Sequence, residues 1–399
     1  MIQIRPHNLS LNALTDLPNW REISLIFEIL QNFKTFLIGG AVRDLLLNRT
    51  PLDFDFSTEA KPSQIKEAFA KRGLKTSDLG ARFGTIGVFL NGKMYEITTF
   101  RKDSNYANFR HPKEVIFTEN LELDVLRRDF TINALAFSPK TGLLDLINGL
   151  SDLKERKIRA IGEPKARFSE DALRILRALS FSMRFDFEIE NNTKEAMFCN
   201  KNLLTHISKE RITNEWLKII APKNAGNLES LLSEFQDILK VPFINFELKR
   251  LLKLKKEGKN VKNMSLVFLN AILLNPKNVD DLGNTAFSNA QKREILQMQE
   301  LLKNKDFSKS GIKKMLFLAG KDLVLDLFNS QNDAKNLEKL EEILQNNEAF
   351  CLKQLAINGS DLDFIEPKER KNVLLSLLFQ VIDNKLINNR TSLLNAIQK

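Results

Sequence analysis

Asp53 and Asp55 are the residues of this 399-residue chain whose type and spacing first suggest chemistry. They alternate with apolar residues, and side chains two apart in a strand point to the same face, so we expect Leu52, Phe54 and Phe56 to face the core. Neighbouring carboxylates repel unless a cation lies between them. Oxygen ligands of this kind suit Mg²⁺, which one or two carboxylates plus substrate phosphates usually hold. The alternative is the solvated face of an edge strand.

A Gly-Gly turn lies just upstream of this pair. The apolar run 36–38 has the length of a strand, and it leads directly into Gly39 and Gly40, where a backbone can approach a ligand without a Cβ in the way. Arg43 follows in a segment with helical spacing of its apolar residues. Backbone N–H groups, a guanidinium and a metal site within one strand-turn-helix-strand unit indicate that the chain handles triphosphates.

A third carboxylate, Glu96, lies in a predicted hairpin. Residues 84–100 read as two apolar strands joined by Asn91-Gly92, the strongest short hairpin signal. If the second strand neighbours the Asp pair, Glu96 joins the catalytic group; ordinary exposed strand polarity is the alternative. The polar segment 101–118 follows, and it is either a loop that moves during the reaction or a long surface connection.

Dense charge between apolar runs marks the segment Arg127-Arg128-Asp129. Charges held near a core are normally paired or bound to an anion. Residues 142–153 then read as a turn and a short strand that lead out of the first domain.

Further along, residues 169–185 are predicted to form one helix, with Ser169 as its N-cap. Asp171, Arg174 and Arg177 recur every three residues and would share a face. An ordinary amphipathic helix with an i,i+3 ion pair is one interpretation. The sharper one is a protein template for a nucleobase: a carboxylate accepts from the exocyclic amine of cytosine or adenine, and a guanidinium donates to the ring nitrogen. Uracil and guanine, which present a ring N–H and a carbonyl, would be rejected.

The length and the net charge of the chain indicate how many domains it has and what kind of partner it binds. A chain of 399 residues predicts two or more domains, and 60 Lys and Arg against 50 Asp and Glu favour a polyanionic partner. Cys199 and Cys351 have no metal-ligand spacing. We see no signal peptide or membrane span and expect a soluble, cytoplasmic protein without a membrane partner. From about Lys209 the sequence is helix-rich, and Lys249–Lys262, with seven basic residues, is either a solvated helix face or a phosphate-tracking surface.

Five motifs in order carry a resemblance to a known family: GGAVRD with DFD, RRDFTINA, GLLDLINGLSDL, EDALRILRA and Glu210-Arg211-Ile212. From Phe36 to about Ile220 the chain resembles the bacterial class II CCA-adding enzymes of the tRNA nucleotidyltransferase/poly(A) polymerase family. The resemblance implies an α+β protein with a polymerase-beta-like nucleotidyltransferase head built on a mixed sheet, followed by all-α parts. These would be a head at 1–150, a neck with the nucleobase template at 151–220, and a body and tail for tRNA at 221–399.

The resemblance also implies roles for individual residues. Asp53 and Asp55 would hold Mg²⁺, the cofactor. Glu96 stays a further catalytic candidate because of its place in the predicted hairpin. The nucleotide-binding residues would be Gly39, Gly40, Arg43, Arg128, Asp171, Arg174 and Arg177. Relatives often carry another arginine where this chain has Ser180.

The implied activity is addition of C, C and A to the 3′ end of tRNA from CTP and ATP, with release of pyrophosphate. A poly(A) polymerase is the nearest competing interpretation, but Gly80-Ala81 precedes Arg82 where those enzymes usually have a basic GRRF-like segment, which favours the tRNA enzyme. A tRNA nucleotidyltransferase that adds only CC or only A would fit the same motifs. A catalytically silent RNA-binding protein is disfavoured, because every expected ligand residue is present.

Overall fold

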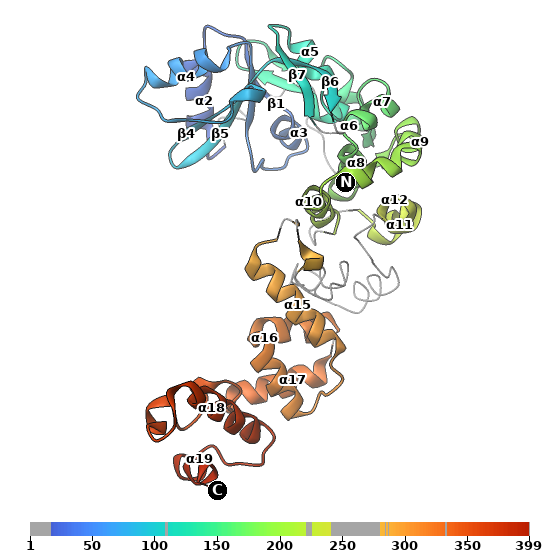
Figure 1. Ribbon diagram of the computed structural model, residues 1–399. Helices are drawn as coiled ribbons and strands as arrows, with labels where there is room; N and C mark the ends of the chain where they lie inside the picture. Colours follow the sequence, from blue (N-terminus) through green and yellow to red (C-terminus); the bar gives the residue numbers. More distant parts are fainter. Residues whose placement is uncertain are drawn as a thin grey trace. The chain divides into compact units, whose positions relative to one another are not determined.

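The computed structural model describes residues 17–107, 111–220, 226–240, 280–283, 285, 287–331 and 333–398 (Figure 1). The chain divides into two compact units. The first comprises Met1–Ile220 with Asn224–Ile238, and the second comprises Ala221–Lys223 with Leu239–Lys399. The division into head, neck, body and tail at residues 150 and 220 stays a prediction.

A seven-stranded mixed sheet forms the centre of the first unit, in the order β3-β4-β5-β2-β1-β8-β9. Its strands are β1 Thr35–Ile38, β2 Asp55–Thr58, β3 Thr76–Gly80, β4 Thr85–Leu90, β5 Lys93–Thr99, β8 Ala136–Ser138 and β9 Gly142–Leu144. Only the pairing of β2 with β5 is parallel; the other neighbours in this sheet run antiparallel. The mixed sheet, followed by a mainly helical remainder, confirms the predicted α+β class.

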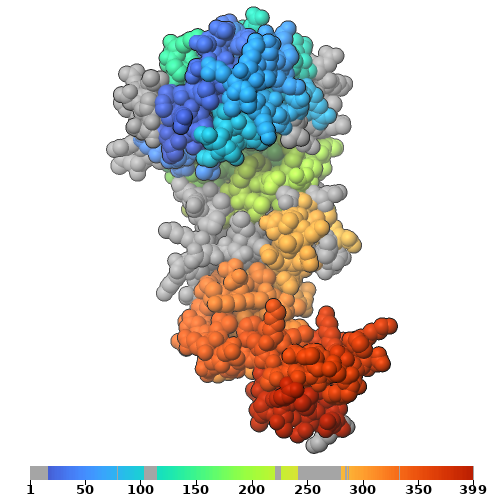
Figure 2. Space-filling model, turned by 90° about the vertical axis from the view of Figure 1, so that its left-hand side faces the viewer, coloured from blue at the N-terminus to red at the C-terminus, as the bar shows by residue number. Residues whose placement is uncertain are grey.

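Four helices accompany this sheet: α2 Trp20–Ile29, α3 Gly40–Leu46, α4 Pro62–Ala70 and α5 Leu121–Leu126. The apolar positions of α2 recur at helical spacing, and Ile23 and Ile26 are fully buried as that spacing predicts. Phe27 of the same helix meets Phe56 of β2 edge to face, with 5.4 Å between ring centroids. Figure 2 shows the outside of this region, in blue to cyan, as one continuous surface.

Two hairpins extend from the strands. The predicted β4–β5 hairpin is confirmed, with Asn91 and Gly92 at positive φ of 48° and 78° as a primed turn requires. The prediction of an irregular segment at 101–118 is wrong, because β6 Arg101–Ala107 and β7 His111–Phe117 pair as an antiparallel ribbon. The sequence of this segment is mostly polar and shows no regular alternation of apolar residues, so the period-2 signal of a strand is missing. Figure 1 shows the ribbon beside α5 and α7.

The remaining elements of the first unit are almost all helical: α6 Gly149–Glu155, α7 Pro164–Glu170, α8 Leu173–Phe185, α9 Asn191–Asn200, α10 Lys209–Ile219, α11 Leu228–Glu234 and α12 Gln236–Leu239. One small departure from the all-helical prediction is a parallel pair of two-residue strands, β10 Lys157–Ile158 and β11 Glu188–Ile189.

Helices also build the second unit as far as it is described: α15 Asn289–Lys303, α16 Lys309–Ser330, α17 Ala334–Gln345, α18 Pro367–Ile382 and α19 Arg390–Ile397. A kink interrupts α16 at Gly320, whose φ of 79° suits a residue without a Cβ. The basic segment Lys249–Lys262 lies outside the described residues. Among the helices that are described, none combines the length and the apolar character needed to cross a bilayer.

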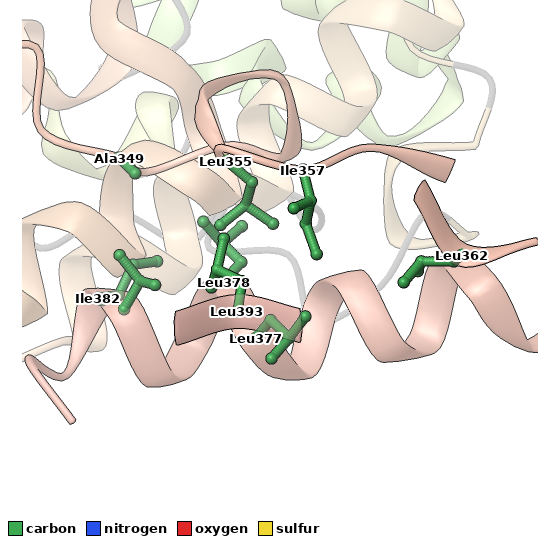
Figure 3. Packing of buried hydrophobic residues seen from close by; sticks show 9 residues of the cluster. Ala349, Leu355, Ile357, Leu362, Leu377, Leu378, Ile382 and Leu393 are labelled. Carbon is green, nitrogen blue, oxygen red and sulfur yellow. The ribbon is translucent and has the colours of Figure 1, made fainter. Parts of the chain in front are cut away.

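One apolar cluster holds α18 and α19 against the chain that precedes them. Figure 3 shows Leu355 and Ile357 pointing toward the helix that carries Leu377, Leu378 and Ile382. Leu378 is fully buried in this cluster. Its side chain therefore contributes apolar burial and close packing to the second unit.

Leu378→Ala is expected to destabilise this unit by about 2–5 kcal/mol, because it removes buried methyl groups and leaves a cavity. Urea unfolding measures the loss. Phe364→Ala in the same unit is the matched control: Phe364 is 63% exposed, so its change should stay within about 0.5 kcal/mol. Equal effects of both substitutions would contradict this packing.

Candidate active site

Two strands bring the predicted carboxylates together. Asp55 opens β2, and its register partner on the parallel strand β5 is Glu96. This pairing confirms that the Glu96 strand neighbours the aspartate strand, and Asp53 lies two residues before β2. The expected inward position of Leu52 is wrong, since Leu52 is 84% exposed. The strand begins only at Asp55, so alternation does not extend back to Leu52.

The charges around Asp55 fit a cation. Loss of hydration raises the pKa of Asp55, the neighbouring Glu96 and Asp53 carboxylates raise it further, and Arg128 opposes them. Among the residues the structure describes, no three His, Cys, Asp or Glu side chains form a metal cage by themselves. The chemistry of the donors still fits a magnesium ion, which takes few carboxylates and fills its other positions with water and phosphate oxygens.

Gly39 brings the backbone close to Arg128. Its φ of 75° favours glycine, and a Cβ there would lie 3.3 Å from Nη1 of Arg128. The N–H of Gly39 donates to the carbonyl of Leu135 at 3.2 Å, so this predicted ligand donor is already used inside the fold. Arg128 in turn donates through Nη2 to Oγ of Ser57 at 3.1 Å. The arginine is thereby fixed beside the Asp55 strand.

Arg43 lies deeper than a simple nucleotide-contact role requires. Its side chain is 3% exposed, and it donates to Oδ1 of Asp44 at 2.9 and 2.7 Å and to Oδ1 of Asn133. Its guanidinium also lies over the ring of Phe185, 4.6 Å from the centroid. Arg43 therefore links α3, which begins at Gly40, to α8. Burial lowers its pKa although Asp44 opposes the shift.

Asp171 lies at a break between two helices, so the prediction of one helix from Ser169 to Phe185 is wrong. α7 ends at Glu170, Asp171 is extended at φ −144° and ψ 99°, and α8 begins at Leu173. Ser169 belongs to α7 rather than capping a new helix. The polar and apolar residues after the break keep helical spacing within α8, so the sequence pattern does not mark the break.

The two sides of the Asp171 carboxylate have different partners. Oδ1 accepts from the N–H of Leu173 at 3.1 Å, and Oδ2 accepts from Nη2 of Arg211 at 2.8 Å. Arg211 belongs to the Glu210-Arg211-Ile212 motif on α10. The contact brings together two motifs that are 40 residues apart in the sequence.

The side chain of Arg174 contacts the backbone of the residue that follows helix α5. It donates to Oε2 of Glu170 at 2.8 Å, and its Nη2 donates to the carbonyl of Arg127 at 3.1 Å. The simple interpretation of an i,i+3 ion pair does not describe this arrangement, because Asp171 and Arg174 pair with different residues. Of the two, Arg174 contacts the segment 127–129, through the carbonyl of Arg127.

Arg177 forms a tight pair with Asp129. Its Nε and Nη2 donate to Oδ2 of Asp129 at 2.8 and 2.6 Å. Burial alone would raise the pKa of Asp129, but Arg177 and the Asn133 amide outweigh it and lower the pKa to about 2. The same carboxylate helps to raise the pKa of Arg177 against the effect of burial. The expectation that charges in this segment are paired is confirmed.

Asp129→Asn should therefore cost stability in a pH-dependent way. A fall from the ordinary value of 3.8 to about 2 corresponds to about 2 kcal/mol of stabilisation. A carboxylate with a lowered pKa contributes this fully above pH 5 and loses it as the pH falls toward 2. Urea unfolding of both proteins at pH 6, 4 and 3 should show a shrinking difference; a constant difference would contradict the ion pair.

Three carboxylates with structural importance were not predicted as site residues: Asp124, Asp129 and Glu215. Asp124 and Asp129 stand in the charged run around Arg127-Arg128, and their position between apolar residues was the available signal. Glu215 accepts from Oγ of Ser180 at 3.0 Å, and its ion pair with Lys218 is 2.7 Å long. Ser180, the departure from the family pattern, thus holds a buried carboxylate in place.

Comparisons with known proteins agree with this geometry. Residues 35–159 match the family model of the poly(A) polymerase head domain, and residues 186–239 match the model of the probable RNA- and SrmB-binding site of polymerase A. The crystal structure of the Bacillus stearothermophilus CCA-adding enzyme in complex with CTP superposes with a TM-score of 0.77 at 27% identity, over 96% of this chain and 98% of that one.

Curated relatives extend the similarity along nearly the whole chain. The CCA-adding enzyme of Pediococcus pentosaceus is 35% identical over 92% of this chain and 94% of its own length. That of Bacillus licheniformis is 35% identical over 83% of this chain and 84% of its own. Agreement at this level over both units, together with paired carboxylates on a mixed sheet, shows that the chain belongs to the CCA-adding enzymes, a family of tRNA nucleotidyltransferases.

Proposed function

We propose that this protein adds C, C and A to the 3′ end of tRNA, using CTP and ATP and releasing pyrophosphate at each step. One observation supports the proposal most strongly: the segment 127–129 lies next to the carboxylates of the sheet and also contacts the helix that carries Arg174 and Arg177. Arg128 flanks Asp55, while Asp129 holds Arg177 on the same helix as Arg174. The residues assigned to base recognition and those assigned to nucleotide transfer thus both contact the segment 127–129.

Asp53 and Asp55, with Glu96 beside them, would hold the magnesium ion. Bound there, the ion would reduce the charge on the α-phosphate and help deprotonate the tRNA 3′-hydroxyl. Arg128 supplies a guanidinium beside these carboxylates for the phosphates of the incoming nucleotide. Gly39 and Gly40 keep the turn above β1 free of side chains.

Base selection is assigned to Asp171 and Arg174, with Arg177 as their support. Asp171 provides acceptor oxygens for the exocyclic amine of cytosine or adenine, and Arg174 provides donors for the ring nitrogen. In the described structure Arg211 orients Asp171, and the Arg127 carbonyl orients Arg174. The edges of uracil and guanine place a donor against Arg174 and an acceptor against Asp171, so both bases are disfavoured.

The second unit and the net charge of +10 supply the tRNA contacts in this proposal, because phosphate neutralisation dominates nucleic-acid affinity. The body and tail at 221–399 are assigned to this role. The cytoplasm, where the chain would meet its tRNA substrate, is the proposed place of action.

Extension assays with one nucleotide at a time test the proposal. A tRNA that lacks CCA should accept C from CTP alone, and a tRNA that already ends in CC should accept a single A from ATP. Long adenosine tails on either substrate would identify a poly(A) polymerase instead. Extension of only the tRNA that lacks CCA, with C alone, would identify a CC-adding enzyme, and extension of only the tRNA that ends in CC would identify an A-adding enzyme.

A further inference from the structure

Asp124 is a fully buried carboxylate of α5 whose two oxygens serve different neighbours. Such a group is costly to bury unless it is paired, and here both oxygens are. Burial by itself would raise the pKa of Asp124, but Arg128 and Arg127 hold it below its usual range. The side chain is therefore charged, and its contacts are fixed on two sides.

Oδ2 faces the carboxylate site. It accepts from Nη2 of Arg128 at 3.1 Å and from Oγ of Ser57 at 3.3 Å. Ser57 lies two residues after Asp55 on β2, and Nη1 of Arg128 lies against Gly39. This oxygen therefore determines where the Arg128 guanidinium stands beside Asp55.

Oδ1 serves Arg127 and the first residue of β6. It accepts from Nε and Nη2 of Arg127 at 2.9 and 2.7 Å, and from the N–H of Arg101 at 3.3 Å. The carbonyl of Arg127 accepts from Nη2 of Arg174. By holding Arg127 in place, Asp124 also holds in place the carbonyl that accepts from Arg174.

We propose that Asp124 is a positioning residue that couples base selection to nucleotide transfer, by holding Arg128 with one oxygen and Arg127 with the other. The inference rests on the proposed function, because it assigns Arg174 to the base and Arg128 to the phosphates. A correctly selected base and a correctly placed triphosphate then depend on the same buried carboxylate.

Asp124→Asn breaks the contacts on one side of the carboxylate while it changes the volume of the side chain very little. An amide has one acceptor oxygen, and its NH₂ group must face donors on the other side, so residue 124 loses its bond to either Arg127 or Arg128. We expect kcat/KM for CTP to fall roughly ten- to hundredfold, the range typical of residues that orient site ligands. The ratio of CTP to UTP incorporation should fall about fivefold or more.

Two side-specific variants keep the test decisive if Asp124→Asn folds poorly. Ser57→Ala disturbs only the Oδ2 side and should lower kcat with an unchanged CTP to UTP ratio. Arg127→Gln removes the side-chain bonds to Oδ1 and should lower the ratio. Combining Asp124→Asn with Arg174→Ala should change the ratio less than the sum of the single effects, because both act through one contact.

Glu190→Gln is the matched control. Glu190 is also a well-paired carboxylate, accepting from the N–H groups of Asn192 and Thr193 at the start of α9. Rates per folded molecule, with folding followed by circular dichroism, should be unchanged for this variant. If Asp124→Asn also keeps its rate and its ratio, or if Ser57→Ala and Arg127→Gln alter stability alone, Asp124 has only a structural role. Absence of C and A addition by the wild type would instead reject the proposed function.

Discussion

Replacing Asp53 or Asp55 with alanine is expected to abolish transfer from CTP and from ATP alike. Both carboxylates are assigned to the magnesium site, and a bound ion contributes several kcal/mol to stabilising the transition-state charge. The rate should therefore fall by about a thousandfold or more. Single-turnover extension of tRNA lacking CCA measures the rate, and filter binding should show nearly unchanged tRNA affinity.

Asp78→Ala provides the control for these two variants. Asp78 belongs to β3 of the same sheet, but it is exposed and pairs only on the surface with Lys66. Exposed ion pairs contribute little, so its transfer rate should match that of the wild type. Substantial magnesium-dependent transfer by both Asp53→Ala and Asp55→Ala would remove the two-carboxylate site from the mechanism.

Asp171→Ala is expected to weaken base discrimination as well as the rate. The substitution removes the acceptor for the exocyclic amine and leaves Arg211 without its carboxylate partner. Losing one partner in a site built for hydrogen bonding costs roughly 1–3 kcal/mol, or about five- to 150-fold. The ratio of CTP to UTP incorporation on one tRNA should fall within this range.

Comparison with other variants separates selection from catalysis. Asp55→Ala should slow every nucleotide alike, while Glu195→Ala, on an exposed position of α9, should change neither rate nor ratio. If Asp171→Ala remains active with an unchanged ratio, Asp171 serves only to hold Arg211 and the base must be read elsewhere.

The sequence pattern predicted the strands that carry Asp55 and Glu96 better than the surroundings of Asp171. The DFD alternation and the Asn91-Gly92 turn are local signals that placed Asp55 and Glu96 on strands. The pairing of these two strands was only a condition for the role of Glu96, and the structure meets that condition. Leu52 shows the limit of this reasoning, because a pattern does not mark the residue at which a strand begins. The ribbon of β6 and β7 was missed because its sequence is mostly polar and shows no regular alternation of apolar residues.

Partners far apart in sequence could not be derived from spacing. Asp129 and Arg177 are 48 residues apart, and Asp171 and Arg211 are 40 apart. Helical periodicity placed Asp171 and Arg174 on one face, but their actual positions follow from a helix break and from contacts with Arg211 and Arg127. Tertiary contacts of this kind decide where these side chains lie.

Sequencing the products of a competition reaction tests the central claim most directly. Wild-type protein is incubated with magnesium, all four nucleotides at equal concentration, and a tRNA that ends before CCA. If protein side chains select the base, and the carboxylates of the sheet support transfer of the nucleotide, the products should end in CCA and should not be extended further. Products that carry U or G at these positions, or runs of A in place of CCA, would contradict the account.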